Sequence, residues 1–342
     1  MIVEKRSFGY TNKGENVDCY TLCNGGISVE ILTYGGIIRS LFVPVNNELR
    51  DVALGYDDMA GYENQSCYMG ALIGRVGNRI GNAVFSLNDR KYKVDVNDGP
   101  NCLHGGLNGF DKKIWTANTE SDALVLSLNS PDMECGFPGN MTVKVRYSVD
   151  KDTLTIEYTA KSDTDTPISL TNHCYFNLEG HNSGSIENHT IQILADYITP
   201  VDERLIPTGE LLDVTGTPFD LREAKSVGAG MMNEHSQIVL GNGYDHNYVL
   251  TQETELDFKP VAVLESGGLK MTCHTTQPGI QFYSGNFIAD GIGKNNAKYL
   301  KRSGLCLETQ GWPDAVNHPA FPSCILRAGE VYNHKTAYSF SI

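Results

Sequence analysis

The stretch MTVKVRYSVDKDTLTIEYTAKS, residues 141–162, decides the fold class. Its apolar side chains fall at every second position, first at Val143, Val145, Tyr147 and Val149 and then at Leu154, Ile156, Tyr158 and Ala160. A period of two is that of a β-strand with one buried face. The two runs meet across residues 150–152, Asp-Lys-Asp, so the stretch predicts a β-hairpin.

Other short strand candidates lie along the chain, with turn residues between them. They are residues 26–32, 36–43, 124–128, 168–178, 190–194, 261–265, 269–275, 279–283 and 304–309. Only residues 221–232 form a convincing helical window, which disfavours βαβ units and a parallel sheet. No linker, charge run or fixed-period repeat divides the chain. The sequence therefore predicts an all-β, antiparallel protein with residues 1–342 in one domain.

Composition narrows the class of protein. The chain has 342 residues with 35 glycines and 13 prolines, which suits many turns between strands. Its net charge of −14 opposes attraction to phosphate backbones or anionic membranes, so we expect no nucleic-acid or membrane partner. No apolar stretch approaches the roughly 20 residues that a bilayer span needs. Nine cysteines without a C-x-x-C pair indicate reduced thiols, and we expect a soluble, unexported, cytoplasmic protein.

Several familiar catalytic devices are missing from the sequence. It contains no G-x-G-x-x-G, no H-E-x-x-H and no G-x-S-x-G, and the Gly-Lys pair at 293–294 lacks the glycine that a phosphate loop needs at 288. Nucleotide cofactors, zinc-protease chemistry and α/β-hydrolase chemistry therefore lose support.

Polar side chains occupy strand candidates in which the opposite face is apolar. Alternation in residues 168–178 places His173 and Tyr175 together on a polar, aromatic face. In residues 304–310, Glu308 shares a face with Cys306, opposite two leucines. Partial desolvation of Glu308 would raise its pKa and bring the carboxylate nearer to a useful basicity. Gln281 faces the same way as Tyr283 in residues 279–283.

Loops supply further candidates. His104 precedes two glycines in NCLHGG, residues 101–106, and these glycines would permit close approach of the backbone to a ligand. Asn78 and Arg79 lie between glycines in GRVGNRIG, residues 74–81, and Asp245 lies in GYDHNYV, residues 243–249. Each of these residues has an ordinary structural explanation when taken alone, and spacing does not place them in one site.

Nine blocks in order along the chain carry a resemblance to a known family. They are GRVGNRI (74–80), NCLHGGLNGFDKKIW (101–115), GFPGNM (136–141), LTNHCYFNL (170–178), PVDERLIPTGEL (200–211), VTGTPFD (214–220), GYDHNYVL (243–250), TTQPGIQFYSGNF (275–287) and LETQGWPDAVNHPAFPS (307–323). At these blocks the sequence closely resembles the aldose 1-epimerases, or galactose mutarotases. One block alone would be a weak signal, whereas nine in order are a strong one.

The resemblance implies a large β-sandwich with an open sugar cleft. It also implies an isomerase that interconverts the α and β anomers of free aldohexoses such as galactose and glucose, without metal or cofactor. We expect a monomer or a homodimer, and the sequence does not decide between them. By motif, Glu308 resembles the general base and His173 the general acid, and His104 resembles a second histidine near the ring oxygen. The residues that resemble sugar ligands or line the cleft are Asn78, Arg79, Asp245, Gln281 and Tyr175.

Departures from the family pattern are modest. Gly77 stands where alanine is more usual, and Trp312 follows the LETQ block, where it could stack near a sugar or pack against the protein. These differences bear on substrate preference and leave the implied reaction unchanged.

Three alternatives remain beside the mutarotase. A hexose-6-phosphate 1-epimerase would need additional cationic groups, and Arg79 is the only basic residue that we assign to the cleft. A non-catalytic sugar-binding protein would be expected to have replaced Glu308 or His173. A glycosidase could use Asp245 and Glu308 as paired carboxylates, but it would not require the histidines.

Overall fold

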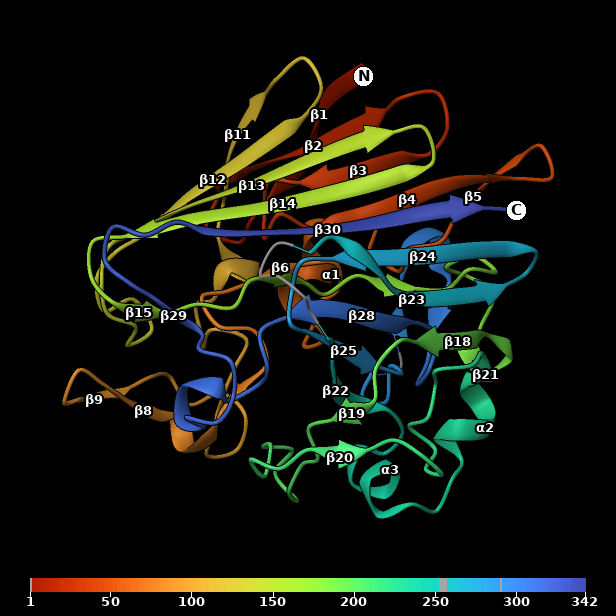
Figure 1. Ribbon diagram of the computed structural model, residues 1–342. Helices are drawn as coiled ribbons and strands as arrows, with labels where there is room; N and C mark the ends of the chain where they lie inside the picture. The colour runs from red at the N-terminus through yellow and green to blue at the C-terminus, as the bar shows by residue number, and fades with distance from the viewer. Residues whose placement is uncertain (1, 252–256, 290) are drawn as a thin grey trace.

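The computed structural model describes residues 2–251, 257–289 and 291–342. A nine-stranded sheet extends in Figure 1 from β11 near the top to β18 and β21 lower on the right, and every pair of neighbouring strands in it is antiparallel. In spatial order its strands are β11 (Thr116–Thr119), β12 (Leu124–Ser130), β13 (Met141–Asp150), β14 (Thr153–Ser162), β30 (Tyr332–Ser341), β24 (Leu269–Thr275), β23 (Lys259–Ser266), β18 (Thr190–Ile193) and β21 (Lys225–Ser226).

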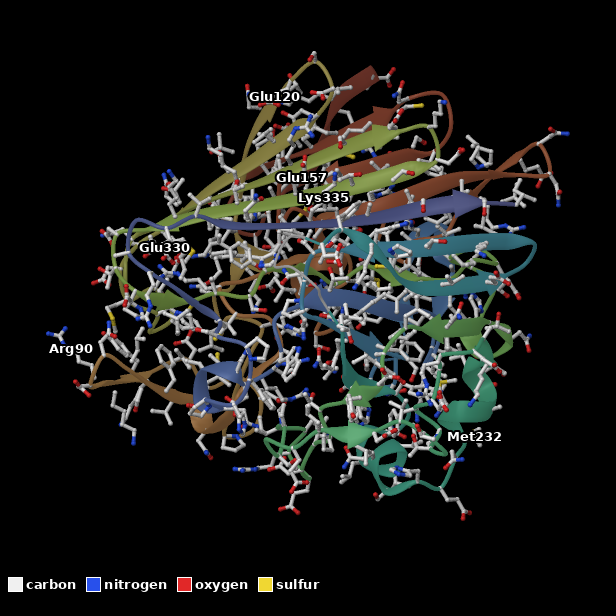
Figure 2. All side chains as sticks on the ribbon, viewed as in Figure 1. Arg90, Glu120, Glu157, Met232, Glu330 and Lys335 are labelled. Carbon is white, nitrogen blue, oxygen red and sulfur yellow. The ribbon has the colours of Figure 1, made fainter. Side chains whose placement is uncertain are left out.

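The predicted hairpin is confirmed as β13 and β14. Asp150 pairs with Thr153, so two residues form the turn, and Lys151 has a φ of 52° there. The apolar residues of both strands are buried, while the residues between them are exposed or half-buried. Glu157 on β14 and Lys335 on β30, both labelled in Figure 2, are half-buried cross-strand partners. The hydrophobic effect therefore selects one face of this hairpin and leaves the other to water.

Two further sheets complete the layers. The five-stranded sheet contains β1 (Ile2–Tyr10), β2 (Asn16–Cys23), β3 (Ser28–Leu32), β4 (Ile38–Val45) and β5 (Glu48–Asp51), in that order. The six-stranded sheet runs through β17 (Tyr175–Phe176), β28 (Leu305–Gln310), β25 (Gly279–Tyr283), β22 (Asp245–Val249), β19 (Tyr197–Ile198) and β20 (Leu212–Asp213).

Short pairs of strands connect these sheets. They are β6 (Leu72–Ile73) with β16 (Thr171–Asn172), β7 (Arg79–Ile80) with β10 (Cys102–Leu103), β8 (Val84–Leu87) with β9 (Arg90–Lys93), β15 (Thr166–Pro167) with β29 (Ile325–Leu326), and β26 (Gly291–Ile292) with β27 (Lys298–Tyr299). Single 3₁₀ turns occur at Gly81–Ala83, Phe110–Lys112, Ile186–Asn188, Lys294–Asn296 and Ala315–Asn317.

One buried cluster joins the three large sheets. It includes Leu41 from β4, Val145 from β13 and Leu307 from β28, all at most 1% exposed. Tyr338 on β30 ties the nine-stranded sheet to the six-stranded one, because its hydroxyl donates to the carbonyl of Leu307 at 3.0 Å. The predicted all-β, antiparallel sandwich is confirmed, with the six-stranded sheet under the long strands (Figure 1).

Helices are few and short in the described residues. They are α1 (Met59–Asn64), α2 (Val227–Met231) and α3 (Ser236–Gly241). The helix predicted over residues 221–232 is wrong in extent, since only its last part, α2, is helical. Two glycines within the five residues of α2 lower its helix propensity, and Ser226 caps it by accepting from the Ala229 N–H at 3.3 Å. No helix of the described chain is long and apolar enough to cross a membrane.

The strand predicted over residues 168–178 is also wrong. The chain there forms two short strands, β16 and β17, which pair with β6 and β28 in different sheets. Both of the predicted faces are buried, because this segment passes through the interior between sheets. The break between the two strands falls at residues 173–174, and His173 lies in it.

Candidate active site

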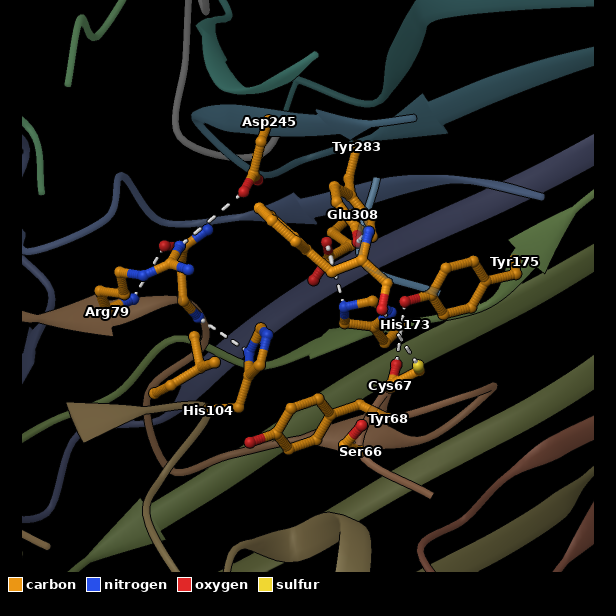
Figure 3. Close-up of a pocket in the computed structure, with 13 residues that line it drawn as sticks. Ser66, Cys67, Tyr68, Arg79, His104, His173, Tyr175, Asp245, Tyr283 and Glu308 are labelled. Atoms are coloured by element: carbon orange, nitrogen blue, oxygen red, sulfur yellow. Dashed lines mark hydrogen bonds and ion pairs between the residues drawn. The ribbon is translucent and has the colours of Figure 1, made fainter. Parts of the chain in front are cut away.

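A pocket opens at the six-stranded sheet, and Figure 3 shows the side chains that line it. Its walls include residues of β17, β22, β25 and β28, the start of β7, the end of β10 and the loop at residues 66–68. Seven of the eight predicted site residues line this pocket, namely Asn78, Arg79, His104, His173, Tyr175, Asp245 and Glu308. Gln281 is outside the lining but contacts it through Asp245.

His173 is held in the break between β16 and β17 by its main chain. Its N–H donates to the carbonyl of Ala71 at 2.9 Å, and its carbonyl accepts from the N–H of Gly70 at 2.9 Å. The imidazole is 5% exposed, and its ring centroid lies 5.0 Å from that of Tyr175. Burial lowers the pKa of His173 to about 4, although its own carbonyl acts in the opposite direction.

Glu308 lies on β28, next to β25 in the middle of the six-stranded sheet. Its side chain is 2% exposed, and its Oε1 lies 3.6 Å from Nε2 of His173. Burial, reinforced by the carboxylate of Asp245, raises the pKa of Glu308 well above its usual range, and the Arg79 cation opposes this only partly. The strand pattern anticipated this desolvation. Its other oxygen, Oε2, has no hydrogen-bond partner among the described residues.

His104 and Asn78 form a reciprocal pair of contacts. The His104 N–H donates to the carbonyl of Asn78 at 3.0 Å, and the Asn78 N–H donates to Nδ1 of His104 at 3.1 Å. Both residues have positive φ, 52° and 60°. Burial lowers the pKa of His104 well below its usual value, and His173 and Arg79 add to the effect. The ring centroids of His104 and His173 lie 5.2 Å apart, so two histidines that are distant in the sequence are neighbours in the pocket.

The first glycine after His104 lies against the main chain of another loop. Gly105 has a φ of 87°, and a Cβ there would lie 1.9 Å from the carbonyl oxygen of Gly74. Glycine at this position therefore allows two main-chain segments to approach each other, and the predicted close approach to a ligand stays a prediction.

Arg79, Asp245 and Gln281 form a second polar group on the opposite wall. The Arg79 Nε donates to Asp98 Oδ2 at 2.8 Å, and its Nη1 lies 4.0 Å from Asp245 Oδ2. Gln281 donates from Nε2 to Asp245 Oδ1 at 2.7 Å. Burial raises the pKa of Asp245, while Arg79 and this hydrogen bond lower it. These groups provide donors and acceptors in a water-poor space, which suits recognition of hydroxyl groups.

Several lining residues escaped the sequence analysis, among them Cys67, Tyr68, Tyr283 and Phe287. Tyr68 has a φ of 56°, and its ring lies 4.6 Å from that of His104. The Tyr175 hydroxyl donates to the carbonyl of Cys67 at 3.0 Å, which ties this loop to β17. Only Tyr283 had a signal in the sequence, because it shares a face with Gln281.

Trp312 packs against the protein. It does not line the pocket; its indole N–H donates to the carbonyl of Pro278 at 2.9 Å, and its ring contacts Phe321 at 4.9 Å.

The pocket contains one cluster with the residue types of a metal site. Ligand atoms of His104, His173 and Glu308 all lie within 4.8 Å of one another, so the three side chains are close enough to hold an ion. The resemblance implies a reaction that needs none.

Comparison with known proteins places this geometry in a family. Residues 18–339 match the family model described as aldose 1-epimerase. The chain is 44% identical over 329 residues to the galactose mutarotase of Bos taurus, covering 95% of this chain and 94% of that protein. It is 38% identical to the aldose 1-epimerase of Escherichia coli K12, covering 93% of each.

Solved structures agree with this assignment. The crystal structure of an aldose epimerase homologue from C. elegans matches with a TM-score of 0.86 at 28% identity, over 98% of this chain and 99% of that one. The resemblance inferred from the nine sequence blocks is thus confirmed. The chain belongs to the aldose 1-epimerase family.

Proposed function

We propose that this protein interconverts the α and β anomers of free aldohexoses such as galactose and glucose. One observation carries the proposal: a buried carboxyl group and a buried imidazole, Glu308 and His173, face each other at 3.6 Å in a pocket lined by hydroxyl-binding groups. Membership of the aldose 1-epimerase family and similarity to a galactose mutarotase and an aldose 1-epimerase support the same reaction.

Mutarotation requires two proton transfers around one carbon atom. Glu308 takes the proton of the anomeric hydroxyl while His173 gives a proton to the ring oxygen, so the C1–O5 bond breaks and an aldehyde forms. Rotation about C1–C2 presents the other face of the aldehyde. The same steps in reverse close the ring and restore both side chains. Each such transfer contributes typically about 10²–10⁴-fold to the rate.

The pair needs a single proton between its two members. Before ring opening that proton is on His173 and Glu308 is ionised; after it, Glu308 is protonated and His173 is neutral. Burial raises the pKa of Glu308 and lowers that of His173, so the empty pocket favours the second arrangement. The free protein is therefore ready for ring closure, and a bound ring sugar must draw the proton back to His173.

The remaining polar groups have binding roles in this proposal. Arg79, Asp245 and Asn78 contact sugar hydroxyls, and Gln281 orients Asp245 through their 2.7 Å hydrogen bond. His104 donates toward the ring oxygen. All of these binding roles belong to side chains of this protein.

A hexose 6-phosphate is a weaker substrate candidate. Of the described residues that line the pocket, Arg79 is the only cation, and it already pairs with Asp98 and Asp245. A phosphate would need further donors of the Arg or Lys type. A role in sugar binding alone does not require the buried acid and base to face each other.

We further propose a cytoplasmic enzyme in which residues 1–342 act as one domain, as a monomer or homodimer. The single-domain arrangement is supported by the buried cluster that draws on residues from Tyr20 to Phe340.

Polarimetry of freshly dissolved α-D-galactose and α-D-glucose tests the function. We expect the wild-type protein to accelerate the decay of optical rotation, and Glu308→Gln to lose that acceleration while its circular dichroism is unchanged and its melting temperature does not fall. A wild-type rate equal to that of buffer would refute the proposal, and parallel assays with glucose 6-phosphate would then test the phosphate alternative.

A further inference from the structure

The two histidines of the pocket differ in what contacts Nδ1, the ring nitrogen nearer the main chain. At His104 the partner is a main-chain N–H, from Asn78. At His173 it is the thiol sulfur of Cys306. In a neutral imidazole one nitrogen carries the proton and the other accepts, so these partners decide which tautomer each ring adopts.

His104 has only one tautomer compatible with its contact. A main-chain N–H can donate but cannot accept, so the Nδ1 atom that lies 3.1 Å from the Asn78 nitrogen must be without a proton. The proton of the neutral ring is then on Nε2. His104 is therefore a hydrogen-bond donor through Nε2 and has no free lone pair with which to take a proton.

Two side chains of one strand, β28, contact the His173 ring from its two nitrogen sides. Cys306 Sγ lies 3.4 Å from Nδ1, and Glu308 Oε1 lies 3.6 Å from Nε2. Because Cys306 and Glu308 are two residues apart on β28, their side chains share a face and stand roughly 6.6 Å apart along the strand. The imidazole fits between them, which fixes both its position and the direction of each nitrogen.

We propose that Cys306 is a positioning residue whose sulfur accepts a hydrogen bond from Nδ1–H of His173, so that His173 and His104 hold opposite tautomers in the free protein. Nε2 of His173 then keeps its lone pair toward Glu308 and the substrate. Nε2 of His104 keeps its proton. This difference assigns proton exchange to His173 and pure hydrogen-bond donation to His104.

The neighbouring groups support this assignment. Glu308 is buried, and its raised pKa favours the protonated form, whose O–H can face Nε2 of His173 at the 3.6 Å separation. Burial also raises the pKa of the Cys306 thiol well above its usual range, so the sulfur stays a neutral, weak acceptor. A weak acceptor leaves the ring only weakly basic, whereas a carboxylate at the same place would favour a permanent imidazolium.

The proposal rests on the proposed function for its consequence, but the tautomers are measurable without activity. Long-range ¹H–¹⁵N spectra of the uniformly ¹⁵N-labelled protein distinguish Nδ1–H from Nε2–H rings. Signals of the two rings are assigned by their loss in His104→Gln and in His173→Gln. We expect an Nε2–H ring for His104 and an Nδ1–H ring for His173. The same tautomer in both rings would overturn the proposal.

Variants of Cys306 then test the positioning role. Cys306→Val fills a similar volume without a hydrogen-bonding atom, and we expect its kcat to fall about tenfold, with KM within about twofold of wild type. The His173 signals should shift toward a mixture of tautomers while those of His104 stay unchanged. Cys306→Ser supplies an oxygen acceptor and should recover part of the loss.

A matched control separates this effect from loss of packing. Cys273 on β24 is equally buried, at 0% exposed, and lies in the hydrophobic core. Cys273→Val should leave kcat and both histidine tautomers unchanged. If Cys306→Val also keeps the wild-type kcat and the His173 tautomer, Cys306 has no positioning role. A wild-type protein that shows the expected Nε2–H ring for His104 and Nδ1–H ring for His173, but does not catalyse mutarotation, would refute the proposed function and leave the tautomer assignment standing.

Discussion

The hairpin β13–β14 and the strand pair β25–β28 are both antiparallel, but their side chains are buried differently. In the hairpin, buried residues alternate with exposed or half-buried ones. In β25 and β28 every residue is buried, including Gln281, Glu308 and Gln310. Each of the three has at least one side-chain polar atom without a hydrogen-bond partner among the described residues. Burying polar atoms without partners costs stability. The hairpin therefore stabilises the fold, whereas β25 and β28 keep polar groups that we propose are available to a ligand.

The largest expected effect comes from exchanging one carboxylate for an amide in each region. Glu308→Gln should lower the mutarotation rate about 10²–10⁴-fold and leave stability unchanged or higher, because the buried amide, unlike the carboxyl group, cannot ionise. Glu157→Gln on β14, which loses a 2.7 Å ion pair with Arg146, should keep full activity and cost at most about 1 kcal/mol.

Polarimetry and denaturant unfolding of both variants measure these outcomes. Equal activities of Glu308→Gln and Glu157→Gln would contradict this distinction between the two regions, since the buried carboxyl group would then have no special role in catalysis.

Truncation of an apolar side chain in the hairpin should lower stability and leave activity unchanged, the reverse of the effect expected for Glu308→Gln. Ile156 is 0% exposed in the core, and Ile156→Ala should lower the free energy of unfolding by about 2–5 kcal/mol through lost contacts and a cavity. At a temperature where the variant is folded, its kcat should match that of wild type. Urea unfolding and polarimetry at one temperature test this, and a kcat loss in the folded variant would show that the two regions are coupled.

The pH dependence of stability should differ in sign between a pocket carboxyl and a surface one. Glu308 has a higher pKa in the folded protein than in the unfolded chain. Its contribution to the stability of the folded state is therefore fully present below the unfolded pKa of about 4.5, and this contribution is lost as pH rises through the folded-state pKa. Glu308→Gln should therefore gain stability relative to wild type as pH rises, by at most about 1.4 kcal/mol per pH unit.

Asp165, at the surface, provides the opposite case. Hydrogen bonds from Asn88, Ala328 and Arg327 lower its pKa to about 2, so its stabilisation is present above about 3.8 and is lost as pH falls through about 2. Asp165→Asn should thus lose stability relative to wild type as pH rises from 2 to 5. Urea unfolding across pH 2–8 checks both slopes, and slopes of the same sign would contradict the burial argument.

Metal removal should have the smallest effect. His104, His173 and Glu308 are close enough to hold an ion, but a ring of His104 with its proton on Nε2 offers no ligand atom there. We expect extensive dialysis against EDTA to leave the mutarotation rate unchanged. A loss that Zn²⁺ restores would show that the cluster works as a metal site and would also contradict the tautomer proposed for His104.

Sequence predicted the site better than it predicted the local structure around it. Alternation correctly placed Glu308 opposite Leu305 and Leu307, because β28 is a regular strand. The same reasoning failed for residues 168–178, where the chain leaves one sheet for another and both faces are buried. Tyr68 gave no signal, since its position depends on a loop at positive φ and on contacts with residues far along the chain.

The amino-acid sequence by itself determined the all-β class, the long hairpin and, through nine ordered motifs, the family. These depend on local periodicity and on residue identity, both of which can be read along the chain. Only the tertiary structure decided that His104, His173 and Glu308 share one pocket, and that Cys306 and Asn78 contact their imidazoles. Burial and distance between residues more than a hundred positions apart arise from the packing of three sheets, and these set the pKa values and tautomers on which the chemistry depends.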